Sequence, residues 1–381
     1  MDLEIKKEDN MKKILHIPNY FLPNHGGIEQ VAYDIISGLG NEEYIHKVIC
    51  FNNNKNTKTD IYLGIEVHRI GYWKKVASQA ISFQYFFELK KIISEFNPDI
   101  IYFHMPNPLI SLYLLLLKIR NRKLILHWHS DIVDQKTIKK FYLPFQNIML
   151  NKANQIFVTS PDYKTGSEDL KGYLSKVDII PNVIDKDKFI LNPENLKNIE
   201  EIRLKYNNKK ILFFLGRHIP YKGLEYLIDT ADYIDKEAVI LIGGQGSLTE
   251  KLKEQAKNKE NIEFLGRITD EEVKEYLNSS YLFLFPSITK NEAFGVALAE
   301  ALYNGIPAVG FAIEGSGVNW VNKNEYTGFM VENKNVKELA EKINLFLRNE
   351  NLRRAMSINA KKWVAENFDK KLMIEKLKKC L

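Results

Sequence analysis

The chain has 381 residues, and its 54 lysines and arginines against 48 aspartates and glutamates give a net charge of +6. This length is more than one ordinary hydrophobic core holds, so we expect two domains. An apolar content of 45% with 12% aromatic residues excludes a largely disordered chain. The two cysteines, Cys50 and Cys380, are too few for a disulfide framework or a cysteine metal cluster, and they fit a reducing cytoplasm.

Residues 1–10 are polar and lack the apolar core of a signal peptide, so we expect a flexible tail. From residue 11 to about 184, short runs of isoleucine, leucine and valine alternate with stretches of helical periodicity. Such runs are typical of a parallel sheet that helices cover on both faces. We therefore predict one doubly wound, Rossmann-like domain over residues 11–184.

A second alternation starts at residue 210 with the run KILFFLG and predicts another Rossmann-like domain over residues 210–360. The polar stretch 185–209 is interpreted as hinge and linker, and the last stretch, 361–381, is helical and rich in lysine and glutamate. The predicted fold class is α/β, with two doubly wound domains that face each other across a cleft. Ligands of such sheets bind beyond the carboxyl ends of the strands.

Two glutamates in the second domain flank the start of a predicted helix. Glu292 precedes a helix expected from about Phe294 to Asn304, and Glu300 lies inside it. The eight-residue spacing puts the carboxylates roughly 10 to 12 Å apart, with the free N–H groups of Phe294 and Gly295 between them. A diphosphate with a hydroxylated group at each end, as in a nucleotide sugar, fits this arrangement. The alternative is an amphipathic helix with two solvated acids.

Two permanent cations follow the first strand of the second domain. Arg217 comes directly after the strand, and Lys222 opens the next helix. Two cations and a helix start at one strand end predict an anion site, strong enough to replace a divalent metal opposite a diphosphate leaving group. The alternative is a solvated surface pair. Gly243, Gly244 and Gly246 end another strand and are interpreted as a loop that lets a ligand come close.

Two adjacent glycines, Gly26 and Gly27, stand between the first strand and the first helix, in the loop that also holds His25. A Gly-Gly turn lets the backbone approach a phosphate. The residues alone favour a purely structural turn, and the dinucleotide fingerprint G-x-G-x-x-G is absent from the sequence.

His127 and His129 close a strand of the first domain, and alternation puts both on the same side of it. His129, the last residue of the run, is expected to project into the cleft, and the alternative is a pair of buried core histidines. A zinc site needs three protein ligands or more, and the sequence indicates no third ligand. We therefore predict no metal site here.

The phrase from Glu292 to Glu300, E-x-F-G-x-x-x-x-E, resembles the signature of a large family of retaining glycosyltransferases, family 4 of the sequence classification. That family includes bacterial group 1 mannosyl-, glucosyl- and rhamnosyltransferases of polysaccharide and O-antigen assembly. The phrase from Gly216 to Gly223, G-R-x-x-x-x-K-G, is also similar to the family's. The resemblance covers nearly the whole chain and implies the GT-B fold, with residues 361–381 crossing back onto the first domain.

The resemblance also implies roles for single residues. Asp185 and Asp187, formally a metal-binding D-x-D pair, match the family's hinge phrase instead, although Val183 stands where a glycine usually follows Asn182. By this resemblance, His129 and Glu292 contact the sugar, Glu300 contacts the ribose, and Arg267 and Ile268 hold the nucleobase. The diphosphate is held by Arg217, Lys222 and the N–H groups of Phe294, Gly295 and Val296. Gly26 and Gly27 contact the diphosphate or the acceptor.

The predicted function is metal-independent, configuration-retaining transfer of a hexosyl group from a UDP- or GDP-sugar to a hydroxyl of a lipid-linked saccharide, without a cofactor. Two alternatives stay open. A nucleotide-sugar epimerase of the same fold needs an acid/base pair and no acceptor site. A non-catalytic scaffold would bind the sugar nucleotide without turning it over.

Basic residues gather in two places in the first domain. Trp73, Lys74 and Lys75 form one patch, and a second follows the apolar run 112–117. Motifs of nucleic-acid recognition are absent from the sequence, so we expect no nucleic acid and favour an anionic membrane surface, peripheral on the inner face of the cell membrane. The alternative is a buried helix with cations at its carboxyl end. The second patch comprises Lys118, Arg120, Arg122 and Lys123.

Overall fold

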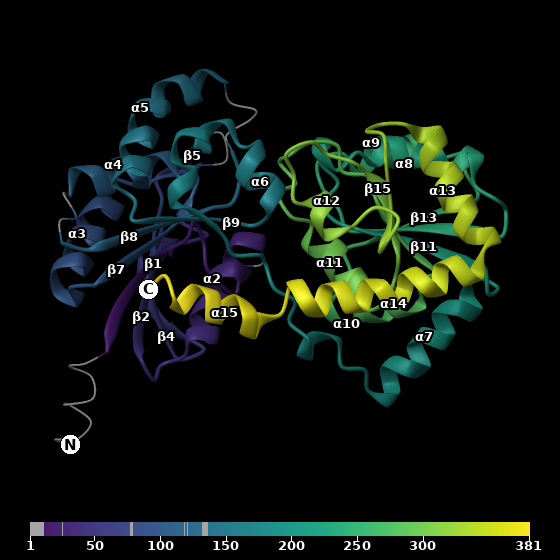
Figure 1. Cartoon of the computed structure of the whole chain (residues 1–381), viewed down its shortest axis with the longest axis horizontal. Coiled ribbons are helices and arrows are strands. Elements are labelled where there is room, and N and C mark those ends of the chain that lie inside the picture. The colour runs from purple at the N-terminus through teal and green to yellow at the C-terminus, as the bar shows by residue number, and fades with distance from the viewer. Residues whose placement is uncertain (1–10, 25, 77–78, 118, 120, 132–135) are drawn as a thin grey trace. The chain divides into compact units, whose positions relative to one another are not determined.

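The computed structural model describes residues 11–24, 26–76, 79–117, 119, 121–131 and 136–381. The expected tail, residues 1–10, lies outside the described residues, as does His25. The chain divides into two compact units (Figure 1). The first takes in residues up to 159 with 167–183 and 370–381, and the second takes in 160–166 and 184–369. The expected bounds were 184 for the end of the first domain and 361 for the start of the returning segment.

The first unit is built on a sheet with the strand order β10-β9-β8-β7-β1-β2-β4-β3, in which every described pair is parallel except β3 with β4. All six residues of β7 are buried, as a central strand with helices on both faces requires. The strands are β1 (Lys12–Ile17), β2 (Tyr44–Phe51), β3 (Lys58–Tyr62), β4 (Ile65–Ile70), β7 (Ile100–Met105), β8 (Lys123–Trp128), β9 (Gln155–Val158) and β10 (Val177–Ile179), with a separate hairpin of β5 (Lys74–Val76) and β6 (Gln79–Ile81).

Helices follow the strands of this unit as a doubly wound sheet requires. They are α2 (Gly27–Leu39), α3 (Gln84–Phe96), α4 (Pro108–Leu116), α5 (Lys136–Lys152) and η1 (Glu168–Lys176). The last helix of the chain, α15 (Lys370–Lys378), adds Met373, Ile374 and Leu377 to the same hydrophobic core as Val31 and Ile35 of α2. A non-helical break at Phe368 and Asp369 separates α15 from α14 (Glu350–Asn367). The expected segment 361–381 therefore consists of the end of α14 and the whole of α15.

The second unit holds a six-stranded, fully parallel sheet with the order β13-β12-β11-β14-β15-β16. Counted from β11, this is the order 3-2-1-4-5-6 of nucleotide-binding Rossmann sheets, and it reverses between β11 and β14. Ligands of such sheets bind where the order reverses, at the carboxyl ends of the strands. The strands are β11 (Lys210–Leu215), β12 (Ala238–Gly243), β13 (Ile262–Gly266), β14 (Leu282–Phe285), β15 (Ala308–Phe311) and β16 (Gly328–Val331).

The strands of this sheet are connected by helices, and two apolar clusters surround it. The predicted α/β class with two Rossmann-like units is confirmed. The remaining helices are α6 (Pro161–Gly166), α7 (Pro193–Lys205), α8 (Leu224–Thr230), α9 (Thr249–Ala256), α10 (Asp270–Ser279), α11 (Val296–Tyr303), α12 (Val318–Val321) and α13 (Val336–Arg348), with the short η2 (Asp187–Phe189), η3 (Pro220–Lys222) and η4 (Ala231–Tyr233).

Candidate functional site

The loops that follow β11 and β14 meet where the strand order of the second unit reverses. Ile288 donates its backbone N–H to the carbonyl of Tyr221 at 2.9 Å, which ties the two loops together. Gly223 adopts a φ of +61°, and a Cβ on it would collide with the carbonyl oxygen of Pro286. Only glycine allows this approach, so the backbone itself fixes the place of the predicted cations.

Lys222 and Glu292 form an ion pair at this point, between the Nζ atom and Oε2. Each side chain is only 12% exposed. The Oγ of Ser287 lies 3.3 Å from the same carboxylate oxygen, and the Lys222 ammonium stands 5.3 Å from the ring centre of Phe285. The sequence analysis assigned Lys222 to the diphosphate and Glu292 to the sugar, and in the structure the two side chains contact each other directly. Arg217 is exposed nearby, with Nη2 3.4 Å from the hydroxyl of Tyr221.

Helix α11 begins at Val296, two residues later than predicted. Gly295 has a φ of +88° and ends the preceding loop in a left-handed conformation. The side chain of Phe294 is buried, and its ring lies 5.2 Å from that of Phe368. The first N–H groups of the helix are therefore those of Val296, Ala297 and Leu298, and Phe294 and Gly295 belong to the preceding loop.

Glu300 is also paired with a lysine. The Nζ of Lys188 lies 3.3 Å from Glu300 Oε1 and 3.6 Å from Asp270 Oδ1. Burial raises the pKa of Glu300, and the Lys188 ammonium offsets part of that rise. Lys188 belongs to η2, in the stretch that the sequence indicated only as linker. In the D-x-D phrase, Asp185 Oδ1 accepts the N–H of Asp187 at 3.1 Å and closes a turn.

The glycines after β12 face protein backbone. A Cβ on Gly244, whose φ is +110°, would collide with the carbonyl oxygen of Gly216. Gly246 lies against His218 in the same way. At these two positions the glycines let the loop after β12 pack against the loop after β11, a contact that the sequence did not indicate. Nearby, Ile268 is half-buried and Arg267 is exposed.

Gly26 caps α2, and Gly27 is its first residue. A Cβ on Gly26 would collide with the carboxylate of Glu29, whereas the space beside Gly27 is open. A carboxylate in the first turn stabilises the positive end of the helix. It also repels an incoming phosphate, so the contacts of Gly26 favour the structural interpretation of this turn.

The predicted histidines of the first unit do lie on one side of β8. The rings of His127 and His129 stack at 4.4 Å between centroids and within 2° of parallel. A third histidine, His104 on β7, places Nδ1 2.9 Å from Nε2 of His129. Burial lowers the pKa of all three, that of His127 to about 3, so they are neutral at pH 7. The signal for His104 was that both strand runs, DIIYFH and KLILHWH, end in histidine.

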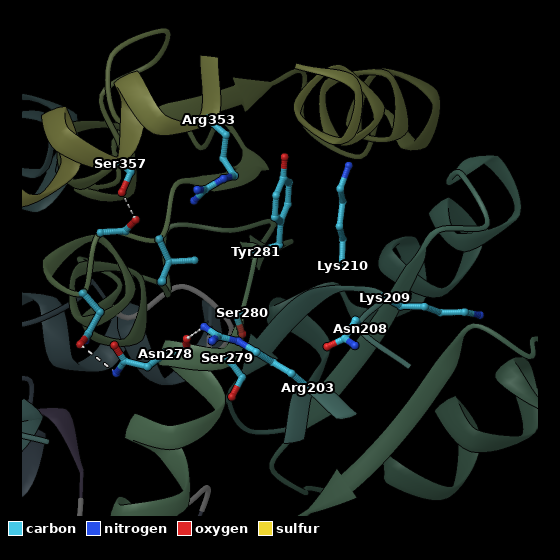
Figure 2. A pocket seen from close by; sticks show the side chains of 13 residues that line it. Arg203, Asn208, Lys209, Lys210, Asn278, Ser279, Ser280, Tyr281, Arg353 and Ser357 are labelled. Atoms are coloured by element: carbon cyan, nitrogen blue, oxygen red, sulfur yellow. Dashed lines mark hydrogen bonds between the residues drawn. The ribbon is translucent and has the colours of Figure 1, made fainter. Parts of the chain in front are cut away.

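A pocket of about 390 Å³ opens elsewhere in the second unit (Figure 2). It includes Lys210, which begins β11, and Tyr281, which precedes β14, so it lies at the amino ends of these strands. The Tyr281 ring stands between Lys210 Nζ at 5.1 Å and the Arg353 guanidinium at 4.9 Å. Since Rossmann sheets bind their ligands at the carboxyl ends, this pocket is separate from the site around Lys222.

Comparison with known proteins identifies the family. The family described as Glycosyltransferase Family 4 matches residues 25–188, and the family described as Glycosyl transferases group 1 matches residues 196–363. The chain is 30% identical over 322 residues to D-rhamnosyltransferase WbpZ of Pseudomonas aeruginosa, covering 84% of this chain and 82% of that one. It is 28% identical over 369 residues to O-antigen chain mannosyltransferase C of Escherichia coli, covering 95% and 96%.

A similar solved structure is that of Anabaena Alr3699/HepE in complex with UDP and glucose. It matches with a TM-score of 0.76 over 97% of this chain and 98% of that chain, at 17% sequence identity. The likeness shows the same fold. The chain thus belongs to the group 1, family 4 glycosyltransferases, and it is a glycosyltransferase. The family and the GT-B class predicted from the sequence are confirmed.

Glu300 provides a test of the assigned site. We expect Glu300→Gln to weaken donor binding by about 10- to 100-fold, since a hydrogen bond to a charged group is worth about 1.5 to 3 kcal/mol. The resemblance assigns Glu300 to the ribose, and such a contact is equally present in the ground and transition states, so kcat should change much less. Calorimetric titration with UDP- and GDP-sugars measures the first effect and single-turnover kinetics the second.

Glu341→Gln, at an exposed position of α13, is the matched control and should leave both quantities unchanged. A Glu300→Gln enzyme that binds donor normally but turns over slowly would place Glu300 at the reacting sugar instead.

Proposed function

We propose that this enzyme transfers a hexosyl group, with retention of configuration and without a metal, from a UDP- or GDP-sugar to a hydroxyl of a lipid-linked saccharide in cell-surface polysaccharide assembly. The observation that carries the proposal is the Lys222–Glu292 pair at the reversal of strand order, beside the start of α11. The relatives named as a rhamnosyltransferase and an O-antigen mannosyltransferase support the hexosyl group and the pathway class. The complex of HepE with UDP and glucose supports a nucleotide diphosphate donor.

The ion pair suits a ligand that carries both an anion and hydroxyl groups. A diphosphate next to Lys222 offers the ammonium a second counter-charge, which frees lone pairs of Glu292 for hydroxyls of the sugar. When the bond to the sugar breaks, negative charge grows on the leaving phosphate. Lys222 and the exposed Arg217 stabilise that charge most in the transition state, together with the N–H groups at Val296.

The remaining parts of the donor, which are the ribose, the nucleobase and the transferred sugar, are assigned to other residues. Glu300, held by Lys188, accepts hydrogen bonds from the ribose, and the loop at Arg267 and Ile268 holds the nucleobase. His129 contacts the transferred sugar as a neutral hydrogen-bond partner, because burial keeps its pKa well below the ordinary value. We assign no residue as a base, and the leaving phosphate takes the proton of the acceptor hydroxyl. We assign the nucleotide diphosphate of the donor to the second unit and the acceptor to the first unit.

The leaving diphosphate tests the role of the cations. Lys222→Ala removes a charge-assisted contact and should lower kcat/KM by about 10²- to 10³-fold, or roughly 2.7 to 4 kcal/mol. Wild-type activity should survive EDTA, because fixed cations replace the metal. The assay is transfer from labelled UDP- and GDP-sugars to lipid-linked acceptors.

Lys209→Ala, an exposed lysine at the amino-end pocket, is the control and should be as active as wild type. Complete loss of activity on chelation, restored by Mg²⁺ or Mn²⁺, would contradict departure of the diphosphate without a metal. It would make Asp185 and Asp187 the candidate metal ligands.

The lipid-linked acceptor is supported by an apolar and basic surface on the first unit. Trp73, Phe83 and Phe87 are 65%, 70% and 66% exposed, and the ammonium of Lys74 stands 4.8 Å from the Trp73 ring centre. The backbone N–H of Trp73 donates to Ile81 at 2.8 Å, which holds these residues on adjoining elements. We propose that Trp73, Lys74, Lys75, Phe83 and Phe87 act together at the membrane, and we call these five residues the aromatic-basic patch.

The structure describes only two residues of the second basic group. Lys118 and Arg120 lie outside the described residues. Arg122 donates to Asn97 at 2.9 Å, and Lys123 begins β8 with its Nζ 3.5 Å from the carbonyl of Leu381. Among the described helices, no segment is long and apolar enough to cross a membrane. Docking on a membrane surface therefore rests on the aromatic-basic patch, with aromatic rings at the interface and lysines near anionic headgroups.

Sedimentation with anionic vesicles tests this docking. Each basic residue near an anionic surface contributes about 1 kcal/mol, so Lys74→Glu/Lys75→Glu should reduce the bound fraction strongly, and high salt should reduce it for wild type. Lys361→Glu/Lys362→Glu, an exposed lysine pair of α14, is the matched control. A wild-type protein that stays in the supernatant at low salt, or pellets equally with neutral vesicles, would contradict the proposal.

A further inference from the structure

Three imidazoles converge at the carboxyl ends of β7 and β8. His104 on β7 is the register partner of His127 on β8, and His129 follows His127 on the same side of that strand. One nitrogen of each ring lies within 4.8 Å of a nitrogen of the other two. The side chains of His104 and His127 are fully buried, and that of His129 is 9% exposed. We call these three residues the histidine cluster.

Two nitrogens of the histidine cluster lack a partner among the described residues. His127 Nδ1 forms a hydrogen bond of 3.0 Å with the hydroxyl of Tyr102, and His127 Nε2 has no hydrogen-bond partner among the described residues. His104 Nδ1 forms a hydrogen bond with Nε2 of His129, and His104 Nε2 is likewise unpartnered within the described part of the chain. A buried polar atom without a partner costs about 1 to 3 kcal/mol, and such atoms call for an explanation.

The chemistry of the histidine cluster selects one class of ligand. A neutral imidazole carries a lone pair on one ring nitrogen, and this lone pair binds transition metals. Mg²⁺ and Ca²⁺ prefer oxygen ligands, whereas Zn²⁺ and its neighbours accept three imidazoles and leave one position for water. If Tyr102 accepts the proton on His127 Nδ1, the lone pair of that ring stands on Nε2, the unpartnered atom.

We propose that His104, His127 and His129 form a binding site for a divalent transition-metal ion of the zinc class. Zn–N bonds of about 2.0 to 2.1 Å in a tetrahedral site bring nitrogens to about 3.3 Å from one another. Closing from at most 4.8 Å to this spacing requires the three rings to rotate out of their stack. One nitrogen of each ring supplies a ligand, and the unpartnered Nε2 atoms of His104 and His127 are available for this without loss of a hydrogen bond.

Binding has a consequence for catalysis that rests on the proposed function. His129 is assigned to the transferred sugar, and a metal on its ring withdraws it from that contact. Zn²⁺ should therefore inhibit transfer, and a chelator should restore it. This is consistent with the prediction that activity survives EDTA, because in the proposed function Lys222 and Arg217 assist departure of the diphosphate and no metal is needed for that step.

The test uses the full-length enzyme, freed of metal by dialysis and titrated with Zn²⁺ by calorimetry without donor. We expect one Zn²⁺ per chain, with at least 100-fold weaker binding in His104→Gln. His218→Gln, a buried histidine of the second unit, is the matched control and should bind as wild type does. Wild-type protein that takes up no Zn²⁺, or binds it equally after His104→Gln, would overturn the proposal.

Two further readouts guard against a variant that fails to fold. Circular dichroism checks the variant, and His127→Gln repeats the test on the other strand. The visible spectrum of Co²⁺ added to the wild type should show the intense bands of a tetrahedral nitrogen site, and a weak octahedral spectrum would overturn the proposal. If Zn²⁺ binds through His104 without slowing transfer, the metal site stands and the sugar contact of His129 fails, so the two claims are tested separately.

Discussion

The proposed donor site depends on a largely buried ion pair between Lys222 and Glu292. Each partner is 12% exposed, and removing one partner of such a pair leaves an uncompensated charge that costs about 3 to 5 kcal/mol. The surrounding backbone is arranged to keep both charges in place. Gly223 lets the loop after β11 pack closely against the loop after β14, and Ser287 Oγ lies 3.3 Å from the carboxylate of Glu292. A site built in this way presents a fixed cation and a fixed anion to a ligand that carries both kinds of group.

The same principle recurs along the sheet edge. Glu300 is held by Lys188, so each of the two glutamates of the signature has its own lysine. A paired carboxylate is held in one orientation, and the small reorganisation needed on binding is what electrostatic preorganisation requires. The first unit instead places neutral groups at the carboxyl ends of its strands, because the histidine cluster is buried and uncharged.

Much of the fold could be predicted from the sequence, because continuous apolar runs mark buried parallel strands. The runs that begin at Lys12, Lys123 and Lys210 all became strands of the two sheets. The strands β3, β4 and β16 and the hairpin of β5 and β6 were not predicted. β3 and β16 lie at sheet edges, β5 and β6 are short, and the alternating burial of β4 does not give a continuous apolar run.

The site was predictable as a set of positions but not as a set of contacts. Arg217, Lys222 and Glu292 were expected at strand ends of one sheet, yet nothing in the sequence shows that residues 70 positions apart form a pair. Lys188 and Glu300 are 112 positions apart, and His104 meets His129 only through the register of β7 with β8. The start of α11 was misplaced because the left-handed conformation of Gly295 decides it, and helical periodicity does not reveal that conformation.

We propose that Lys222 and Glu292 act on the donor as one unit, and a double-mutant cycle on kcat/KM measures this most directly. Lys222→Ala, Glu292→Gln and the combined variant are compared with wild type in the same transfer assay, with folding checked by circular dichroism. The account predicts that the combined variant loses no more activity than the worse single variant, because each residue needs the other in place. Losses that add in full would show two independent residues and would contradict the account.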